Sequence, residues 1–158
     1  MKRFKVGVDS YSLKPLGLSA LEALDWAAAN GADGVQFSER PLPAGRDGCD
    51  RAFLDELSAR GRAKGLYLEW GGAEHIPVDL KSGRPKDISA VNRRAAEEAR
   101  ALGVRVVRSC SGGLMRWTDG GPSTEALLRA AAAGLRAQIP MLRDLGVTAT
   151  ALRPTEGT

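Results

Sequence analysis

The stretch ARALGVRVVRS (residues 99–109) has the pattern of a helix end, a single glycine and the start of a strand. Gly103 stands where helices often end in left-handed backbone, a conformation that costs glycine little. The apolar, β-branched residues that follow it are typical of a buried strand. The pattern therefore indicates a protein in which helices and strands alternate.

Three other stretches repeat this pattern: AAANGADGVQF (residues 27–37), GRAKGLYLEW (61–70) and MLRDLGVTATAL (141–152). The four glycines, Gly31, Gly65, Gly103 and Gly146, are separated by 34, 38 and 43 residues, each about the length of one strand–helix unit. With a first strand at residues 4–8, the repeat predicts five parallel strands. Four helices are expected between them, at residues 19–30, 50–64, 87–102 and 123–145. Pro140 lies inside the last of these and predicts a kink or a break there.

Length and composition fit one soluble domain, which we place at residues 1–158 as a single, partial unit. No apolar run is long enough for a signal peptide or a membrane span, so we expect a cytoplasmic protein without a membrane partner. The two cysteines form neither a disulfide framework nor a zinc-ligand spacing. The net charge is +4, but basic and acidic residues alternate along the chain, which argues against a nucleic-acid partner.

The long connections all follow strands. They lie at residues 38–48, 70–85 and 110–123, whereas each helix-to-strand connection needs only one to three residues. In parallel α/β proteins, ligands bind beyond the carboxyl ends of the strands. We therefore expect the functional site at that end of the sheet.

Two architectures fit five such units: parallel (β/α) units of a TIM barrel, ending after about the fifth strand, or an open five-stranded doubly wound sheet. The chain length favours the open sheet. No phosphate-binding glycine fingerprint follows the first strand, however, and no helix follows the fifth, which favours the half-barrel.

Several segments carry a family resemblance: VGVDSYSL (residues 6–13), LEALDWAAANGADGVQFSE (21–39), KGLYLEWGG (64–72), AEEARALGVRVVRS (96–109) and LRDLGV (142–147). Their order and spacing resemble the first half of the sugar phosphate isomerase/epimerase family, the xylose isomerase-like TIM barrels. The resemblance implies an eight-unit barrel that binds a divalent metal (manganese, magnesium or zinc) and moves protons on a sugar or polyol. It also implies metal ligands at the ends of strands five to eight, which are not present in this chain, so we expect a truncated barrel without isomerase activity on its own.

Seven residues at the ends of the expected strands are candidates for contacting a small sugar or polyol. Gln36 stands where the family often has glutamate. Glu69, Trp70 and His75 follow the third strand and would combine a carboxylate, an aromatic face and an imidazole. The others are Tyr11 after the first strand, and Arg108 and Ser109 at the end of the fourth. Arg108 would suit a phosphate or carboxylate. For each of these residues, an ordinary role in loop or barrel packing is the alternative.

Two other functions stay open. One is a sugar- or anion-binding half-barrel that self-associates through its open strand edges, because unpaired edges invite pairing. The other is a nucleic-acid enzyme of the endonuclease branch of the same superfamily. The single histidine, His75, argues against that branch, since it excludes a three-histidine zinc cluster.

Overall fold

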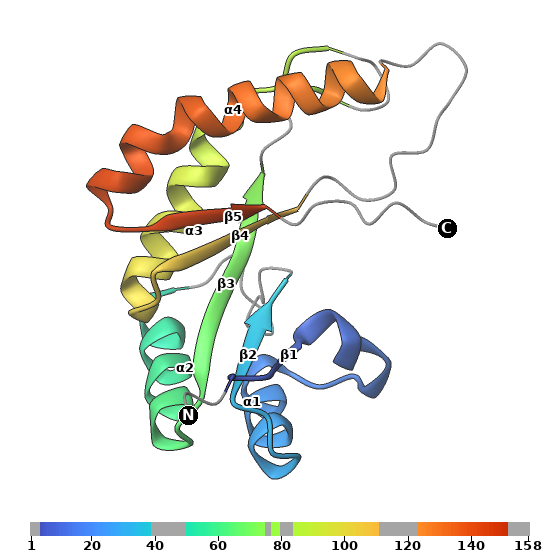
Figure 1. Cartoon of the computed structure of the whole chain (residues 1–158). Coiled ribbons are helices and arrows are strands. Elements are labelled where there is room, and N and C mark those ends of the chain that lie inside the picture. Colours follow the sequence, from blue (N-terminus) through green and yellow to red (C-terminus); the bar gives the residue numbers. More distant parts are fainter. Residues whose placement is uncertain (1–3, 39–49, 75–76, 80–83, 111–122, 152–158) are drawn as a thin grey trace.

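Five parallel strands form one sheet in the order β1-β2-β3-β4-β5, and four α-helices connect them (Figure 1). The computed structural model describes residues 4–38, 50–74, 77–79, 84–110 and 123–151. The elements are β1 (Gly7–Asp9), a 3-10 helix η1 (Ser10–Leu16), α1 (Ala20–Ala29), β2 (Gly34–Phe37), α2 (Arg51–Ala63), β3 (Tyr67–Glu74), α3 (Ser89–Leu102), β4 (Val106–Cys110), α4 (Thr124–Asp144) and β5 (Thr148–Ala151). None of the described helices is long and apolar enough to cross a membrane.

The strand order decides between the two architectures. Each strand pairs in parallel with the next one along the chain, from β1 to β5. A doubly wound sheet requires a point where the strand order reverses, which places helices on both faces. Right-handed crossovers that always step in one direction place every helix on the same face instead, as in a barrel. The open doubly wound alternative is therefore wrong, and the half-barrel is confirmed.

Local signals set the helix ends as predicted. At the start of α1, the Ser19 hydroxyl accepts from the Glu22 amide at 3.3 Å, and the Glu22 carboxylate accepts from the Ser19 amide at 2.8 Å. This reciprocal capping box satisfies two amides that the helix itself leaves unpaired. The four glycines of the repeat all have positive φ, between 68° and 78°. Left-handed glycine therefore ends each helix before the next strand begins.

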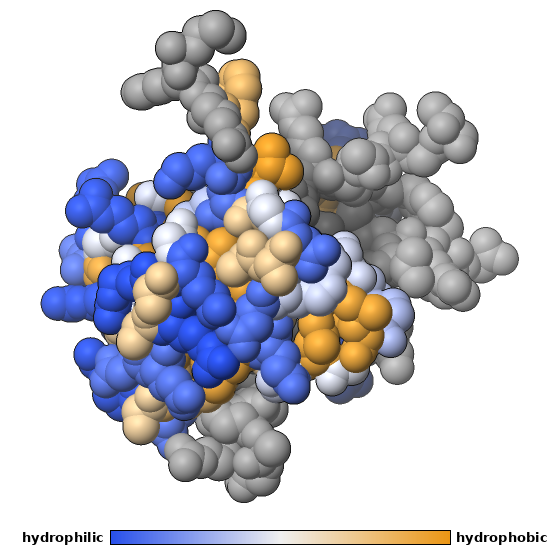
Figure 2. Space-filling model, turned by 90° about the horizontal axis from the view of Figure 1, so that it is seen from below, coloured by the Kyte–Doolittle hydropathy of each residue, from blue (hydrophilic) through white to orange (hydrophobic). Residues whose placement is uncertain are grey.

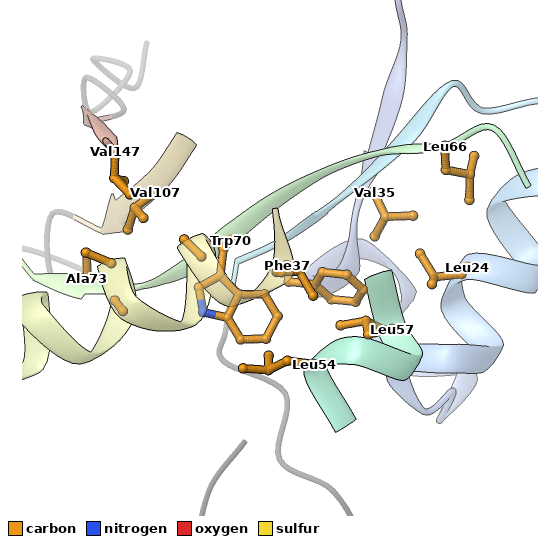
Figure 3. Packing of buried hydrophobic residues seen from close by; sticks show 14 of the residues in the cluster. Leu24, Val35, Phe37, Leu54, Leu57, Leu66, Trp70, Ala73, Val107 and Val147 are labelled. Carbon is orange, nitrogen blue, oxygen red and sulfur yellow. The ribbon is translucent and has the colours of Figure 1, made fainter. Parts of the chain in front are cut away.

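Side chains from one face of the sheet pack against the helices and form the core. Val35, Phe37, Trp70 and Val107 are at most 1% exposed and share one cluster with residues of α1, α2 and α3. Figure 3 shows Trp70 and Phe37 lying between the sheet and the helices, and their rings meet edge-on with centroids 5.9 Å apart. Because side chains alternate along a strand, the residues between these apolar ones point to the opposite face. We call that opposite side the inner face.

The end of the molecule where β2 and β3 begin is mostly hydrophilic (Figure 2). Helices α2 and α3 end here, with Arg60, Arg62 and Arg100 in their last turns. Positive side chains stabilise the negative end of a helix dipole. Asp25 of α1 joins this group by ion pairs to Arg60 (2.7 Å) and Lys64 (2.8 Å). The basic residues thus have a structural role at this end, away from the carboxyl ends of the strands.

The predicted first strand is wrong in its limits. The sequence pattern predicts residues 4–8, but β1 covers Gly7–Asp9. The Asp33 carboxylate accepts from the Val6 amide at 2.8 Å, where a neighbouring strand would offer a backbone carbonyl. The Asp33 amide donates to the Val6 carbonyl at 2.7 Å, so one side-chain bond and one backbone bond join the two residues, and the regular pairing starts at Gly7. The 3-10 helix η1, which no prediction placed, follows directly.

Two further expectations need correction. The connection predicted from residue 70 starts later, because β3 continues to Glu74 through an irregularity between Trp70 and Ala73. Helix α4 continues through Pro140, so of the two predicted effects the break is wrong and the kink stays a prediction.

Candidate functional site

A row of polar side chains crosses the inner face near the carboxyl ends of the first three strands. Asp9, Gln36 and Glu69 are register partners, one on each strand. The Gln36 amide Nε2 donates to the Glu69 carboxylate at 2.6 Å. Both side chains are only partly buried, and they lie on the face opposite the core that α1, α2 and α3 cover. Paired amide and carboxylate groups can bind the hydroxyls of a polyol as acceptors and donors.

Tyr67 forms the floor beneath this row. A Cβ atom on Gly34 would lie 2.5 Å from the Tyr67 ring, and one on Gly7 would lie 2.3 Å from its hydroxyl. The two glycines therefore leave the space that the ring occupies. Burial, helped by the Glu69 and Asp33 carboxylates, raises the pKa of Tyr67. The ring lies one layer below the polar row, toward the start of the strands, with Tyr67 in register with Gly34.

Asp9 holds the ends of the first two strands together. Its carboxylate accepts from the Tyr11 amide at 2.9 Å and from the Ser38 hydroxyl. The Ser38 amide in turn donates to the Ser10 hydroxyl at 3.3 Å. These bonds occupy Asp9 in a structural role, which leaves Gln36 and Glu69 as the groups of the row that can bind a ligand.

A bulge in β3 lies beside this row. Trp70 pairs with Val107 and Ala73 with Ser109, so Gly71 and Gly72 of β3 both stand against Arg108 of β4. Gly72 has φ of 87°, and a Cβ on Gly71 would lie 2.3 Å from the Phe37 carbonyl oxygen. Only glycine fits at these two places, where one strand bulges against the other. Arg108 thus has neighbours on β3 that carry no side chain.

Two of the predicted site residues lie elsewhere. Trp70 is fully buried on the helix side, and its indole nitrogen donates to the Glu98 carboxylate of α3 at 3.2 Å. Its ring faces the core and not the inner face. Tyr11 belongs to η1, is 60% exposed and stands 5.2 Å from the Lys14 ammonium. It lines a separate cavity of about 340 Å³ between η1 and α1.

The structure therefore brings together Gln36 and Glu69 and places Arg108 on the same face. His75 and the side chain of Ser109 lie outside the described residues. Sequence reasoning missed Tyr67, the Asp9–Ser38 contact and the bulge. The glycine pair at residues 71 and 72 was the available signal for the bulge, because adjacent glycines inside a strand pattern often mark one.

The described residues do not fit a divalent metal site. In the part of the chain that the structure describes, no three histidine, cysteine, aspartate or glutamate side chains gather in one place. The carboxylates of the polar row, Asp9 and Glu69, both accept hydrogen bonds from protein donors. Metal ions such as manganese or magnesium need several oxygen ligands that converge on one point. Ligands supplied by later strands remain a prediction.

Comparison with known proteins identifies the fold. No protein-family model matches the sequence, and no curated protein matches it. Solved structures do. A D-psicose 3-epimerase from Clostridium cellulolyticum H10, crystallised with D-tagatose, matches 84% of this chain and 46% of its own with 16% identity and a TM-score of 0.62. Such epimerases are xylose isomerase-like TIM barrels. This chain has the fold of half such a barrel.

Other solved structures agree. Protein SMc04130 from Sinorhizobium meliloti 1021 matches 97% of this chain and 52% of its own, with 24% identity and a TM-score of 0.66. A D-allulose 3-epimerase from Methylomonas sp. matches 96% and 52%, with 17% identity and a TM-score of 0.65. The chain spans about half the length of the structures it matches. The predicted resemblance in fold is thereby confirmed, and activity is a separate question.

Proposed function

We propose that this chain supplies the sugar-binding half of a sugar isomerase or epimerase barrel. The observation that carries the proposal is the 2.6 Å bond between Gln36 and Glu69 on the inner face, at the end of the sheet where parallel α/β proteins bind ligands. The structural neighbours are named as epimerases of psicose, allulose and ribulose, which are small ketoses. A ketose is therefore the ligand class that we assign to this half.

The two side chains have complementary tasks in this proposal. The Glu69 carboxylate accepts hydrogen bonds from sugar hydroxyls, and the Gln36 amide both fixes that carboxylate and offers its own oxygen to a hydroxyl. The Tyr67 ring, which lies over Gly34 and Gly7, supports the pair from below. A ligand seated here would lie on the inner face, with its far side open to whatever completes the barrel.

We further propose that these residues bind sugar without converting it. Epimerisation requires a base and an acid on either side of the carbon that loses its proton. The described residues provide one face of such a site. In a complete barrel, a divalent metal would polarise the sugar oxygens, and its ligands would come from the other units. Formation of psicose from fructose by the purified chain, measured by chromatography, would contradict this part.

Titration of the purified chain with D-fructose, followed by NMR chemical shifts, tests the binding. We expect saturable binding with Kd near 1 mM, equivalent to about −4 kcal/mol, since only one side of the ligand is held. Glu69→Gln removes a charged acceptor worth about 1.5–3 kcal/mol, so affinity should fall roughly tenfold or more. Glu97→Gln, which changes an exposed carboxylate of α3, is the matched control and should bind as the wild type does.

Two results would refute the proposal. If fructose and psicose cause no saturable shifts, or if Glu69→Gln and Glu97→Gln bind the sugar equally well, the inner face is not a sugar site. Far-UV circular dichroism of each variant shows whether it has kept its helices.

A second candidate is self-association, with a second copy of this chain as the occupant of the open edges. A groove of about 590 Å³ lies between α4 and β5 and includes Leu135, Ile139, Leu142 and Val147. At the opposite edge, Phe4 and Val6 are 91% and 68% exposed. Phe4 and Val6 lie four and two residues before Val8, which packs against the core. Residues at this spacing share one face of a strand, so Phe4 and Val6 lie on the helix side, where the groove is.

Parallel addition of one copy's β1 to another copy's β5 would bring Phe4 and Val6 to the level of this groove. Size-exclusion chromatography with light scattering tests this arrangement. We expect dimers or larger species that dissociate in Phe4→Asp, whereas Lys5→Asp, the neighbouring change, should have a smaller effect. A monomer at all concentrations up to the millimolar range would exclude self-association through these strand edges.

A further inference from the structure

Arg108 is a cation on β4 that the inner face presents beside the polar row. Val107, its neighbour on β4, is fully buried on the helix side, so alternation places Arg108 on the face of Gln36 and Glu69. On β3 it faces Gly71 and Gly72, and on β5 it pairs with Thr150. Neither glycine places a side chain beside the guanidinium, and a Cβ on Gly71 would meet the Phe37 and Ser38 carbonyl oxygens.

The guanidinium has an unsatisfied donor. Its Nε atom is buried and has no hydrogen-bond partner. The two carboxylates of β3 have other partners: Glu69 accepts from Gln36, and Glu74 forms an ion pair with Lys86 at 2.5 Å. Glu98, the buried carboxylate of α3, accepts from Trp70 on the other side of the sheet. A buried charged donor without an acceptor destabilises a protein, so such groups commonly find a counter-ion.

We propose that Arg108 binds an anionic group on the sugar ligand, a carboxylate or a phosphate ester. This inference rests on the proposed sugar-binding function and narrows its substrate class. The guanidinium offers donors in a planar fork that matches two oxygens of either anion. The sugar hydroxyls then lie over Gln36 and Glu69, and the anionic end lies over the β3 bulge. The ketoses named for the solved neighbours are neutral, so this chain would differ from them in the ligand it selects.

Isothermal titration of the full chain with three probes tests the inference: D-fructose, D-fructose 6-phosphate and a keto-sugar acid such as 5-keto-D-gluconate. We expect at least one of the two anionic probes to bind tenfold or more tightly than fructose. Tighter binding of the phosphate probe would indicate a phosphate site, and tighter binding of the sugar acid would indicate a carboxylate site. Inorganic phosphate should displace the anionic probe and leave fructose binding unchanged.

Arg108→Met should reduce the ratio of anionic-probe affinity to fructose affinity to less than twofold. Arg105→Met is the matched control, because it removes an exposed arginine three residues earlier and changes the net charge equally. Arg108→Lys keeps the charge but loses the fork, so an intermediate preference is expected. This variant also preserves the test if Arg108→Met does not fold, as judged by circular dichroism.

The outcomes separate the two proposals. If fructose and both anions bind with equal affinity, or if Arg105→Met lowers the preference as much as the Arg108 variants do, the anion site is refuted and sugar binding stands. If no probe binds at all, the proposed function fails and the anion site fails with it.

Discussion

Gly71 lies where the sheet leaves no space for a side chain, and Gly71→Ala should destabilise the fold by about 2 kcal/mol or more. The added Cβ would lie 2.3 Å from the Phe37 carbonyl oxygen and 2.4 Å from that of Ser38. Carbon and oxygen atoms in contact are normally about 3.3–3.6 Å apart, so the strands would have to separate by about 1 Å. Both obstructing atoms are backbone, which cannot rotate away.

The magnitude follows from two opposing effects. Overpacking of a tight interior costs about 1–3 kcal/mol, and the upper part of that range applies because β2 and β3 must move apart. Alanine also restricts the unfolded chain more than glycine does, which returns about 0.4–1 kcal/mol. Gly71 is not among the positive-φ glycines, so left-handed strain adds nothing. A loss of this size is a large fraction of the 5–15 kcal/mol typical of a domain.

Gly61→Ala is the matched control. Its Cβ would meet only the Leu68 side chain, at 3.0 Å, and that side chain can change rotamer. Gly61 lies inside α2, where alanine is favoured over glycine by about 0.5–1 kcal/mol. We expect its stability to stay within about 0.5 kcal/mol of the wild type. Urea unfolding followed by circular dichroism at 222 nm measures both variants. A Gly71→Ala loss below about 1 kcal/mol, or one equal to that of Gly61→Ala, would refute the packing argument.

Two predictions concern groups away from the inner face. Ion pairs with Arg60 and Lys64 lower the pKa of Asp25 from 3.8 to about 2, so their stabilising effect is present above about pH 4 and is lost as the pH falls toward 2. Asp25→Asn should therefore unfold at lower urea than the wild type at pH 6, with the two curves converging near pH 2; a constant gap would contradict the assignment. Trp70→Phe removes the indole donor to the buried Glu98 carboxylate and should cost about 1.5–3 kcal/mol. The same change made in a Glu98→Gln background should cost less, and equal costs in both backgrounds would show that the bond contributes nothing.

Much of the fold was predictable because its signals are local. Each helix end depends on a glycine that accepts left-handed backbone, and the start of α1 depends on a serine and a glutamate three residues apart. The limits of β1 and β3 were missed because they depend on distant partners. The Asp33 carboxylate accepts from the Val6 amide in place of a backbone carbonyl, and the Phe37 carbonyl forces glycine at residue 71.

The candidate site was predictable only in part. Gln36 and Glu69 come from strands 33 residues apart, and their bond depends on the register between β2 and β3. The sequence predicts Trp70 and Glu69 at the same strand end. Successive residues of a strand point to opposite faces, however, so they could not both line the inner face. The alternation of side chains along a strand follows from the sequence. Which of the two faces the helices cover does not.

The sequence by itself determined the alternation of helices and strands, because glycine conformation, helix capping and apolar runs act over a few residues. Only the tertiary structure decided that the strands follow one another in order, that the helices cover one face, and that Gln36, Glu69 and Arg108 share the other. Those features depend on register and on the direction of each crossover. Both are set by contacts between residues about 30 or more positions apart in the chain, which no short segment can encode.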